Sequence, residues 1–71
     1  MGTAIKPQVN DILFHKKGDY YKVLMYGKHS ETGETMICYE SIETKGIHIR
    51  PLSMFTNDRF TIAIRGVDLQ P

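Results

Sequence analysis

Histidine and cysteine side chains are the first candidates for chemistry in this 71-residue chain. The three histidines, His15, His29 and His48, fall in separate parts of the sequence, so a shared metal site would require the fold to gather them. Cys38, the single cysteine, lies in an apolar stretch, where a buried and unreactive thiol is more common than a nucleophile. There is no C-x-x-C pair and no phosphate-binding glycine loop. We therefore expect neither a metal nor a cofactor.

Two short segments carry polar side chains that a small fold alone does not require. The first is the tetrapeptide 29–32, in which serine and threonine hydroxyls suit a turn but His29 and Glu31 are less well explained. The second is the run 47–55, in which Arg50 stands at the expected end of a strand. A guanidinium there can form forked hydrogen bonds with a carboxylate or phosphate, or bind several loop carbonyls.

Two roles for Arg50 remain open on the sequence. The structural role is a clamp on a long hairpin, made through Glu31 or through backbone carbonyls. The second role is to bind an anionic group of a ligand. In either case the two-residue alternation of this strand predicts that Ile47 and Ile49 point inward while His48 and Arg50 point outward.

The elements that must position these residues are β-strands, because helical periodicity is not sustained anywhere and two-residue alternation recurs. Strands are expected around 12–15, 21–25, 35–43, 47–50 and 60–65, with a hairpin tip at 29–34 and one helical turn at 52–55. This spacing predicts an all-β protein, a small SH3-like antiparallel barrel whose closure would leave no exposed sheet edge. An oligonucleotide-binding-type barrel is the alternative, although the long helix that this fold carries between its third and fourth strands is not indicated.

Length and composition point to one globular domain over residues 1–71, with a core at about 11–65 and loose tails at 1–8 and 66–71. No apolar run approaches the roughly 20 residues of a membrane-spanning helix, and no secretory signal is visible. Together with the lone cysteine, this predicts a cytoplasmic protein without a membrane partner. The net charge of +1 disfavours a protein that binds nucleic acid mainly through phosphates.

The same two segments carry a family resemblance. His29-Ser30-Glu31-Thr32, then Tyr39, then Arg50-Pro51-x-x-Met54-Phe55 resemble the signature of small bacterial and phage proteins catalogued as domain of unknown function 1653. The upstream Gly18-x-Tyr20-Tyr21-x-Val23-Leu24 resembles the opening pattern of that family. The resemblance runs from about Phe14 to Phe55 and is poor beyond it. It implies a compact SH3-like β domain and no assigned activity.

Two positions depart from the pattern that the resemblance implies. Members of this family tend to have an aromatic residue, often tryptophan, at the position of His48, and arginine at the position of Glu40. If these positions help to line a ligand surface, the specificity of this chain differs from that of its relatives.

The leading hypothesis is a non-enzymatic binding module whose surface is formed by the hairpin tip and the end of the fourth strand. Its candidate ligand-binding residues are His29, Ser30, Glu31, Tyr39, His48 and Arg50. Arg50 would hold an anionic group, and Tyr39 would offer a flat face to a base or side chain. Either an anionic small ligand or a protein partner suits the charge balance. For a peptide, a groove could be lined by Tyr20, Tyr21, Tyr26 and Tyr39.

Three alternatives belong to other functional classes. The protein could be a weak nucleic-acid-binding accessory protein. It could be an enzyme with His29 as general base and Arg50 stabilising a developing negative charge, which requires the two side chains to lie within a few ångströms of each other. It could also be a structural subunit that completes a larger assembly.

Overall fold

The computed structural model describes residues 2–69, which form five β-strands and two single-turn 3-10 helices. In chain order these are β1 (Ile12–His15), β2 (Tyr20–Lys28), β3 (Thr35–Ser41), β4 (Ile47–Pro51), η1 (Leu52–Met54), β5 (Phe60–Ile64) and η2 (Gly66–Leu69). The strands form one antiparallel sheet in the order β4-β3-β2-β1-β5. The predicted all-β class, its five antiparallel strands and the helical turn before the last strand are confirmed. Over the described residues, no helix has the length and apolar character needed to cross a membrane.

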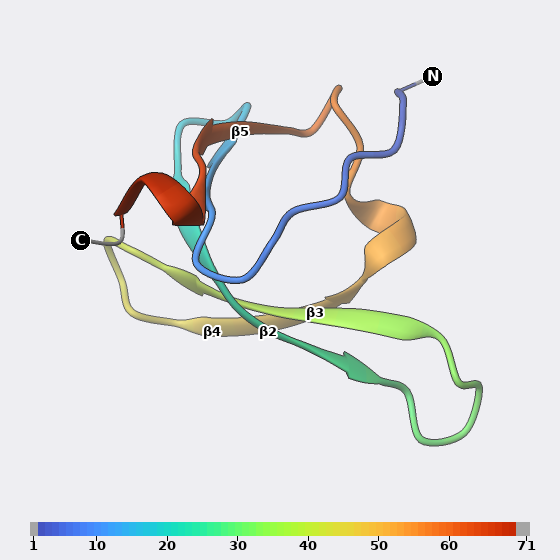
Figure 1. The fold of residues 1–71 in the computed structure, drawn as a ribbon. Coiled ribbons are helices and arrows are strands. Elements are labelled where there is room, and N and C mark those ends of the chain that lie inside the picture. The colour runs from blue at the N-terminus through green and yellow to red at the C-terminus, as the bar shows by residue number, and fades with distance from the viewer. Residues whose placement is uncertain (1, 70–71) are drawn as a thin grey trace.

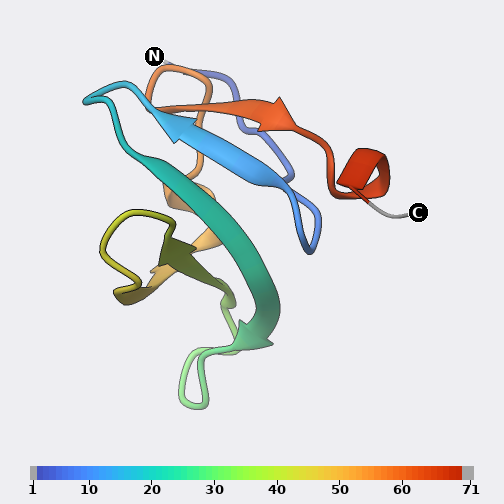
Figure 2. The same ribbon diagram turned by 90° about the vertical axis from the view of Figure 1, so that its left-hand side faces the viewer.

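The sheet curls into a barrel that stays open. In Figure 1, β2, β3 and β4 form a lower layer and β5 lies above it, while β2 curves between the two layers in Figure 2. A register shift between Val23 and Met25 places a β-bulge in β2, which is a usual device for bending a strand. The outer strands β4 and β5 do not pair with each other, so the predicted closure is not reached. Residues 42–46 connect β3 to β4 by a turn, which leaves no room for the helix of the alternative barrel.

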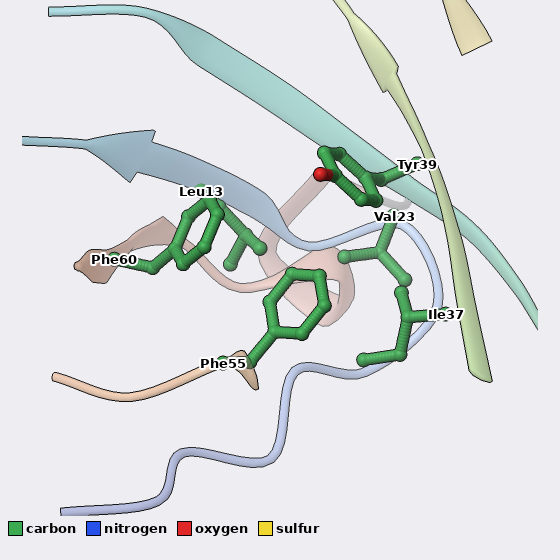
Figure 3. Close-up of a cluster of buried hydrophobic side chains, with 6 residues drawn as sticks. All are labelled: Leu13, Val23, Ile37, Tyr39, Phe55 and Phe60. Atoms are coloured by element: carbon green, nitrogen blue, oxygen red, sulfur yellow. The ribbon is translucent and has the colours of Figure 1, made fainter. Parts of the chain in front are cut away.

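An aromatic cluster forms the centre of the core between the two layers. The buried hydrophobic residues are Leu13, Val23, Ile37, Tyr39, Phe55 and Phe60 (Figure 3). The rings of Phe55 and Phe60 stack with centroids 4.8 Å apart, and Tyr39 packs edge-on against Phe55 at 5.3 Å. Phe55 reaches this position because η1 turns the chain inward directly after β4. We call the sheet face that bears this cluster the inner face and the opposite one the outer face.

The segment 2–8, predicted to be a loose tail, is held against the barrel. Ala4 forms an isolated antiparallel bridge with Thr56, the backbone N–H of Ile5 donates to the Phe55 carbonyl at 3.0 Å, and Pro7 is buried. In the other predicted tail, residues 66–69 form η2, while residues 70–71, like Met1, lie outside the described residues. For residues 2–8 and 66–69, the prediction of loose tails was wrong, because short polar segments with isolated apolar residues give no periodic signal although they can still pack.

Asp11 joins the two ends of the described chain. Its fully buried carboxylate accepts hydrogen bonds from the backbone N–H groups of Gln8 at 2.8 Å and Gly66 at 2.6 Å, and it pairs with the Arg65 guanidinium at 3.2 Å. Gly66 approaches so closely that a Cβ atom at this position would lie 2.6 Å from the Val9 carbonyl oxygen. Glycine is therefore required for this contact.

The face assignment predicted for β4 was wrong. The register pairs His48 with Tyr39 and Arg50 with Ile37, and directly paired residues share a face, so His48 and Arg50 lie on the inner face. Ile47 and Ile49 lie on the outer face and are 54% and 63% exposed. The predicted alternation is present, but the pairing with β3 places His48 and Arg50 on the inner face.

Candidate functional site

The tip of the β2–β3 hairpin, predicted to form half of the site, is a turn held by its own residues. The His29 Nδ1 atom accepts hydrogen bonds from the backbone N–H groups of Glu31 at 3.2 Å and Thr32 at 3.4 Å. The backbone N–H of His29 donates to the Glu34 carbonyl at 2.8 Å. Gly33 takes a φ of 74°, as the predicted left-handed position requires. Ser30 and Glu31 are exposed, so both point to solvent at this tip.

His29 lies at the end of an apolar groove on the outer face. This groove has a volume of about 310 Å³ and is lined by Met25, Gly27, Lys28, His29, Met36, Cys38 and Ile49. Met25 reaches the outer face because the β-bulge after Val23 interrupts the two-residue alternation of β2. Cys38 is half-buried there rather than enclosed in the core.

The other three predicted residues, Tyr39, His48 and Arg50, lie together on the inner face. The imidazole of His48 stacks on the Tyr39 ring with centroids 5.4 Å apart and an interplanar angle of 28°. Tyr21 approaches the same imidazole edge-on at 5.9 Å. Tyr39 is only 3% exposed, so it cannot offer a flat face to a ligand. The exposed ring at this place is His48, which stacks on Tyr39.

Arg50 does not clamp the hairpin through Glu31. Among the residues that the structure describes, the one ion pair within 4.0 Å joins Arg65 to Asp11, so no described carboxylate lies within this distance of the Arg50 guanidinium. Its guanidinium lies beside the Tyr39 hydroxyl instead. Burial raises the pKa of the Tyr39 phenol, and the positive charge of Arg50 opposes this shift. The Arg50 charge therefore remains available to an anion.

Arg50 lines a polar cleft on the side of the barrel where the β1–β2 turn meets the loop before β5. The cleft has a volume of about 410 Å³, and its lining residues are His15, Lys16, Lys17, Arg50, Asp58 and Arg59. A backbone hydrogen bond of 3.0 Å from the Lys16 N–H to the Arg59 carbonyl ties the two loops together. We call this the basic cleft, since Asp58 is the only acid among its lining residues.

His15 reports the positive potential inside the basic cleft. Burial lowers the pKa of this imidazole, and the Lys17 charge lowers it further. Asp19 opposes this shift, and Arg50 and Lys16 add smaller effects in the lowering direction. The Nδ1 atom of His15 accepts a hydrogen bond from the backbone N–H of Lys17 at 3.1 Å, which favours the neutral imidazole. The ring packs edge-on against Phe60 at 4.9 Å, so its position is fixed by the core.

The basic cleft was not predicted as a whole. Of its lining residues, the sequence predicted a ligand-binding role for Arg50 alone, because the others occur at 15–17 and 58–59, in segments that indicate simply a strand end and a loop. The adjacent lysines before Gly18 are the one local signal that could have drawn attention to this turn. Charged residues in a turn are common, however, so the signal becomes meaningful only once β1, β4 and the loop before β5 are placed side by side.

Two other predicted arrangements are not formed. The four tyrosines do not line one groove: Tyr20 packs against Phe14, Tyr26 donates its hydroxyl to the Pro7 carbonyl, and Tyr39 is in the core. His29 and Arg50 line openings on opposite faces of the sheet, so the pair required by the enzymatic alternative is not assembled. Within residues 2–69, no three His, Cys, Asp or Glu side chains group as metal ligands would.

The comparisons with known proteins agree with the motifs in the chain. No curated protein and no solved structure matches it. One family model, described as "Protein of unknown function (DUF1653)", matches residues 12–68. The match continues through β5 to η2, so the expectation that the resemblance fades after Phe55 was wrong. Because the matched region covers most of the 71 residues, the chain belongs to this family, the proteins of unknown function DUF1653.

Proposed function

We propose that this protein is a non-enzymatic, SH3-like binding module that holds an anionic group of its ligand in the basic cleft. The strand order β4-β3-β2-β1-β5, with a 3-10 turn before the last strand, supports the SH3-like description. The half-buried and unpaired Cys38 thiol suits the reducing cytoplasm, which we propose as its compartment.

The observation that carries this proposal is the charge of the basic cleft. Lys16, Lys17, Arg50 and Arg59 line one opening with a single acid, although the whole chain carries only one net positive charge. Like charges that line one opening repel one another, and a bound anion reduces this repulsion. Charge-assisted hydrogen bonds to a phosphate or carboxylate contribute about 1.5–3 kcal/mol each.

Titration of the isotopically labelled protein with inorganic phosphate tests the proposal. We expect amide shifts to cluster at residues 15–17, 50 and 58–59, and the hairpin tip at 29–32 to remain silent. The R50A and K17A variants should each weaken phosphate binding about tenfold or more, the effect of losing one charged hydrogen bond. Lys17 is exposed, so K17A does not disturb the core.

The matched control is K28A. This variant also removes one positive charge, but from the groove on the outer face, and it should leave phosphate binding unchanged. Equal weakening by K28A and K17A would reduce the effect to net charge and refute a specific cleft. Shifts confined to 29–32 would instead support a site at the hairpin tip.

A further inference from the structure

A flat aromatic surface adjoins the basic cleft on the inner face. It consists of the exposed His48 imidazole together with the edge of Tyr21, and His48 is braced from beneath by its stacking on Tyr39. The ring of His15, which lines the basic cleft, lies 6.5 Å from the Tyr21 ring. Tyr21 thus joins the aromatic surface to the basic cleft without a break.

The spacing along β4 relates the two parts of this surface. His48 and Arg50 are two positions apart on the same face of one strand, with one residue between them, which places their Cα atoms about 6.6 Å apart. A ligand that binds both must carry a planar ring and an anion on a linker of a few bonds. The sugar of a nucleotide connects its base to its phosphate in this way.

Resting on the proposed function, we infer that the ligand is a nucleoside phosphate whose phosphate enters the basic cleft and whose base stacks on His48. The nucleotide is either free or one residue of a single-stranded nucleic acid. The near-neutral net charge agrees with this assignment, because one or two phosphates need only the local charge of the cleft.

The orientation of His48 favours stacking over general apolar contact. The His48 ring stacks on the Tyr39 ring with an interplanar angle of 28°. Because this contact already orients the imidazole, His48 loses little rotational freedom when a base stacks on it. Stacking on an aromatic side chain contributes about 1–3 kcal/mol per base, which corresponds to a factor of about 5 to 150 in affinity. This contribution is absent for a ligand that has the phosphate but no base.

Calorimetric titrations with AMP, ribose 5-phosphate and inorganic phosphate separate the two contributions. We expect AMP to bind at least fivefold more tightly than ribose 5-phosphate. In H48A, the affinity for AMP should fall to that for ribose 5-phosphate, while the affinity for inorganic phosphate stays unchanged. In H48W, AMP should bind more tightly than to the unaltered protein, since indole offers a larger stacking surface.

The matched control is H29A, which removes an exposed imidazole from the hairpin tip instead of the inner face. It should change none of the three affinities. Amide spectra of each variant establish that it is folded, and H48W keeps an aromatic ring on Tyr39 if H48A does not fold. Titration with a short oligothymidylate identifies the source: tighter binding than that of thymidine monophosphate assigns the site to single-stranded nucleic acid, and equal binding assigns it to free nucleotides.

The two proposals fail in different ways. If AMP, ribose 5-phosphate and inorganic phosphate bind equally and H48A changes nothing, the stacking inference is overturned and the anion site stands. If none of the three causes shifts at residues 15–17, 50 and 58–59, the anion site itself is wrong. Binding of AMP that is weakened equally by H29A and H48A also overturns the inference.

Discussion

His15 links the charge of the basic cleft to the stability of the fold. Its pKa in the folded protein is lowered from the ordinary value of 6.5, first by burial and then by Lys17. The unfolded chain therefore binds more protons than the folded one as the pH falls below about 6.5, and folding loses stability through this interval. Above pH 6.5 His15 is largely neutral in both the folded and the unfolded protein, so its protonation no longer lowers the free energy of unfolding.

We predict that the free energy of unfolding falls less between pH 7 and pH 5 in H15Q than in the unaltered protein. Urea denaturation at the two pH values measures this difference, and the acidic groups common to both proteins cancel in the comparison. An equal fall in both proteins would show that His15 does not contribute. A bound phosphate should raise the pKa of His15, observable in its ring proton shifts, because the anion offsets the charges of Lys17 and Arg50.

Among the polar side chains, Asp11 is the one whose removal should lower the free energy of unfolding the most. We predict that D11A lowers the free energy of unfolding by about 3–5 kcal/mol, since it leaves the N–H groups of Gln8 and Gly66 without their acceptor and Arg65 without its partner. The control is R65A, which should cost about 1 kcal/mol or less because the Arg65 side chain is 47% exposed. Equal losses in the two variants, measured by urea denaturation, would contradict a role for the buried hydrogen bonds.

Among the elements, β4 shows what alternation in a sequence can and cannot predict. The period of two residues at 47–50 correctly indicates a strand, because it reflects the pleat of the backbone. Which of its two faces lies inward depends on the register with β3, and a shift of one residue exchanges the faces. The same limit applies to β2, where the bulge after Val23 turns Met25 outward.

The reversed faces of β4 predict that two isoleucine-to-alanine substitutions on neighbouring strands differ strongly in their effect on stability. I49A should change the free energy of unfolding by no more than about 0.5 kcal/mol, because Ile49 is 63% exposed. I37A, at the buried position of the neighbouring strand, should cost about 2–5 kcal/mol. Thermal or urea denaturation of both variants checks this. A loss of several kcal/mol in I49A would restore the inward assignment that the sequence suggested.

For the molecule as a whole, the strands and the turn before β5 could be predicted from the sequence, whereas the basic cleft could not. Strands follow from short-range alternation and from glycine and proline positions, which are local properties. The cleft combines His15 and Lys17 with Arg50 and Arg59, and only the antiparallel pairing of β1 with β5 and the curl of the sheet bring them together. The predicted residues of the hairpin tip, by contrast, are adjacent in sequence, but His29 there accepts hydrogen bonds from the backbone of Glu31 and Thr32.

The size of the molecule makes its aromatic core decisive. A domain of this length has a total stability of about 4–11 kcal/mol, and truncation of a buried phenylalanine costs about 3–5 kcal/mol. We predict that F55A loses about 3–5 kcal/mol of this stability, because Phe55 contacts both Tyr39 and Phe60. Thermal or urea denaturation would show this loss as a lower midpoint of unfolding. A cooperative transition at nearly unchanged temperature in F55A would contradict the assigned core.

The contact between Asp11 and Gly66 has a consequence for how the chain is made. It spans 55 residues, and the first strand of the sheet pairs with the last. While the protein is being synthesised, Leu13 lacks its core neighbour Phe60 and the Asp11 carboxylate lacks the N–H donor of Gly66 until those residues have emerged. The domain therefore folds as a unit after its synthesis is nearly complete, and the growing chain remains open to proteases and chaperones until that moment.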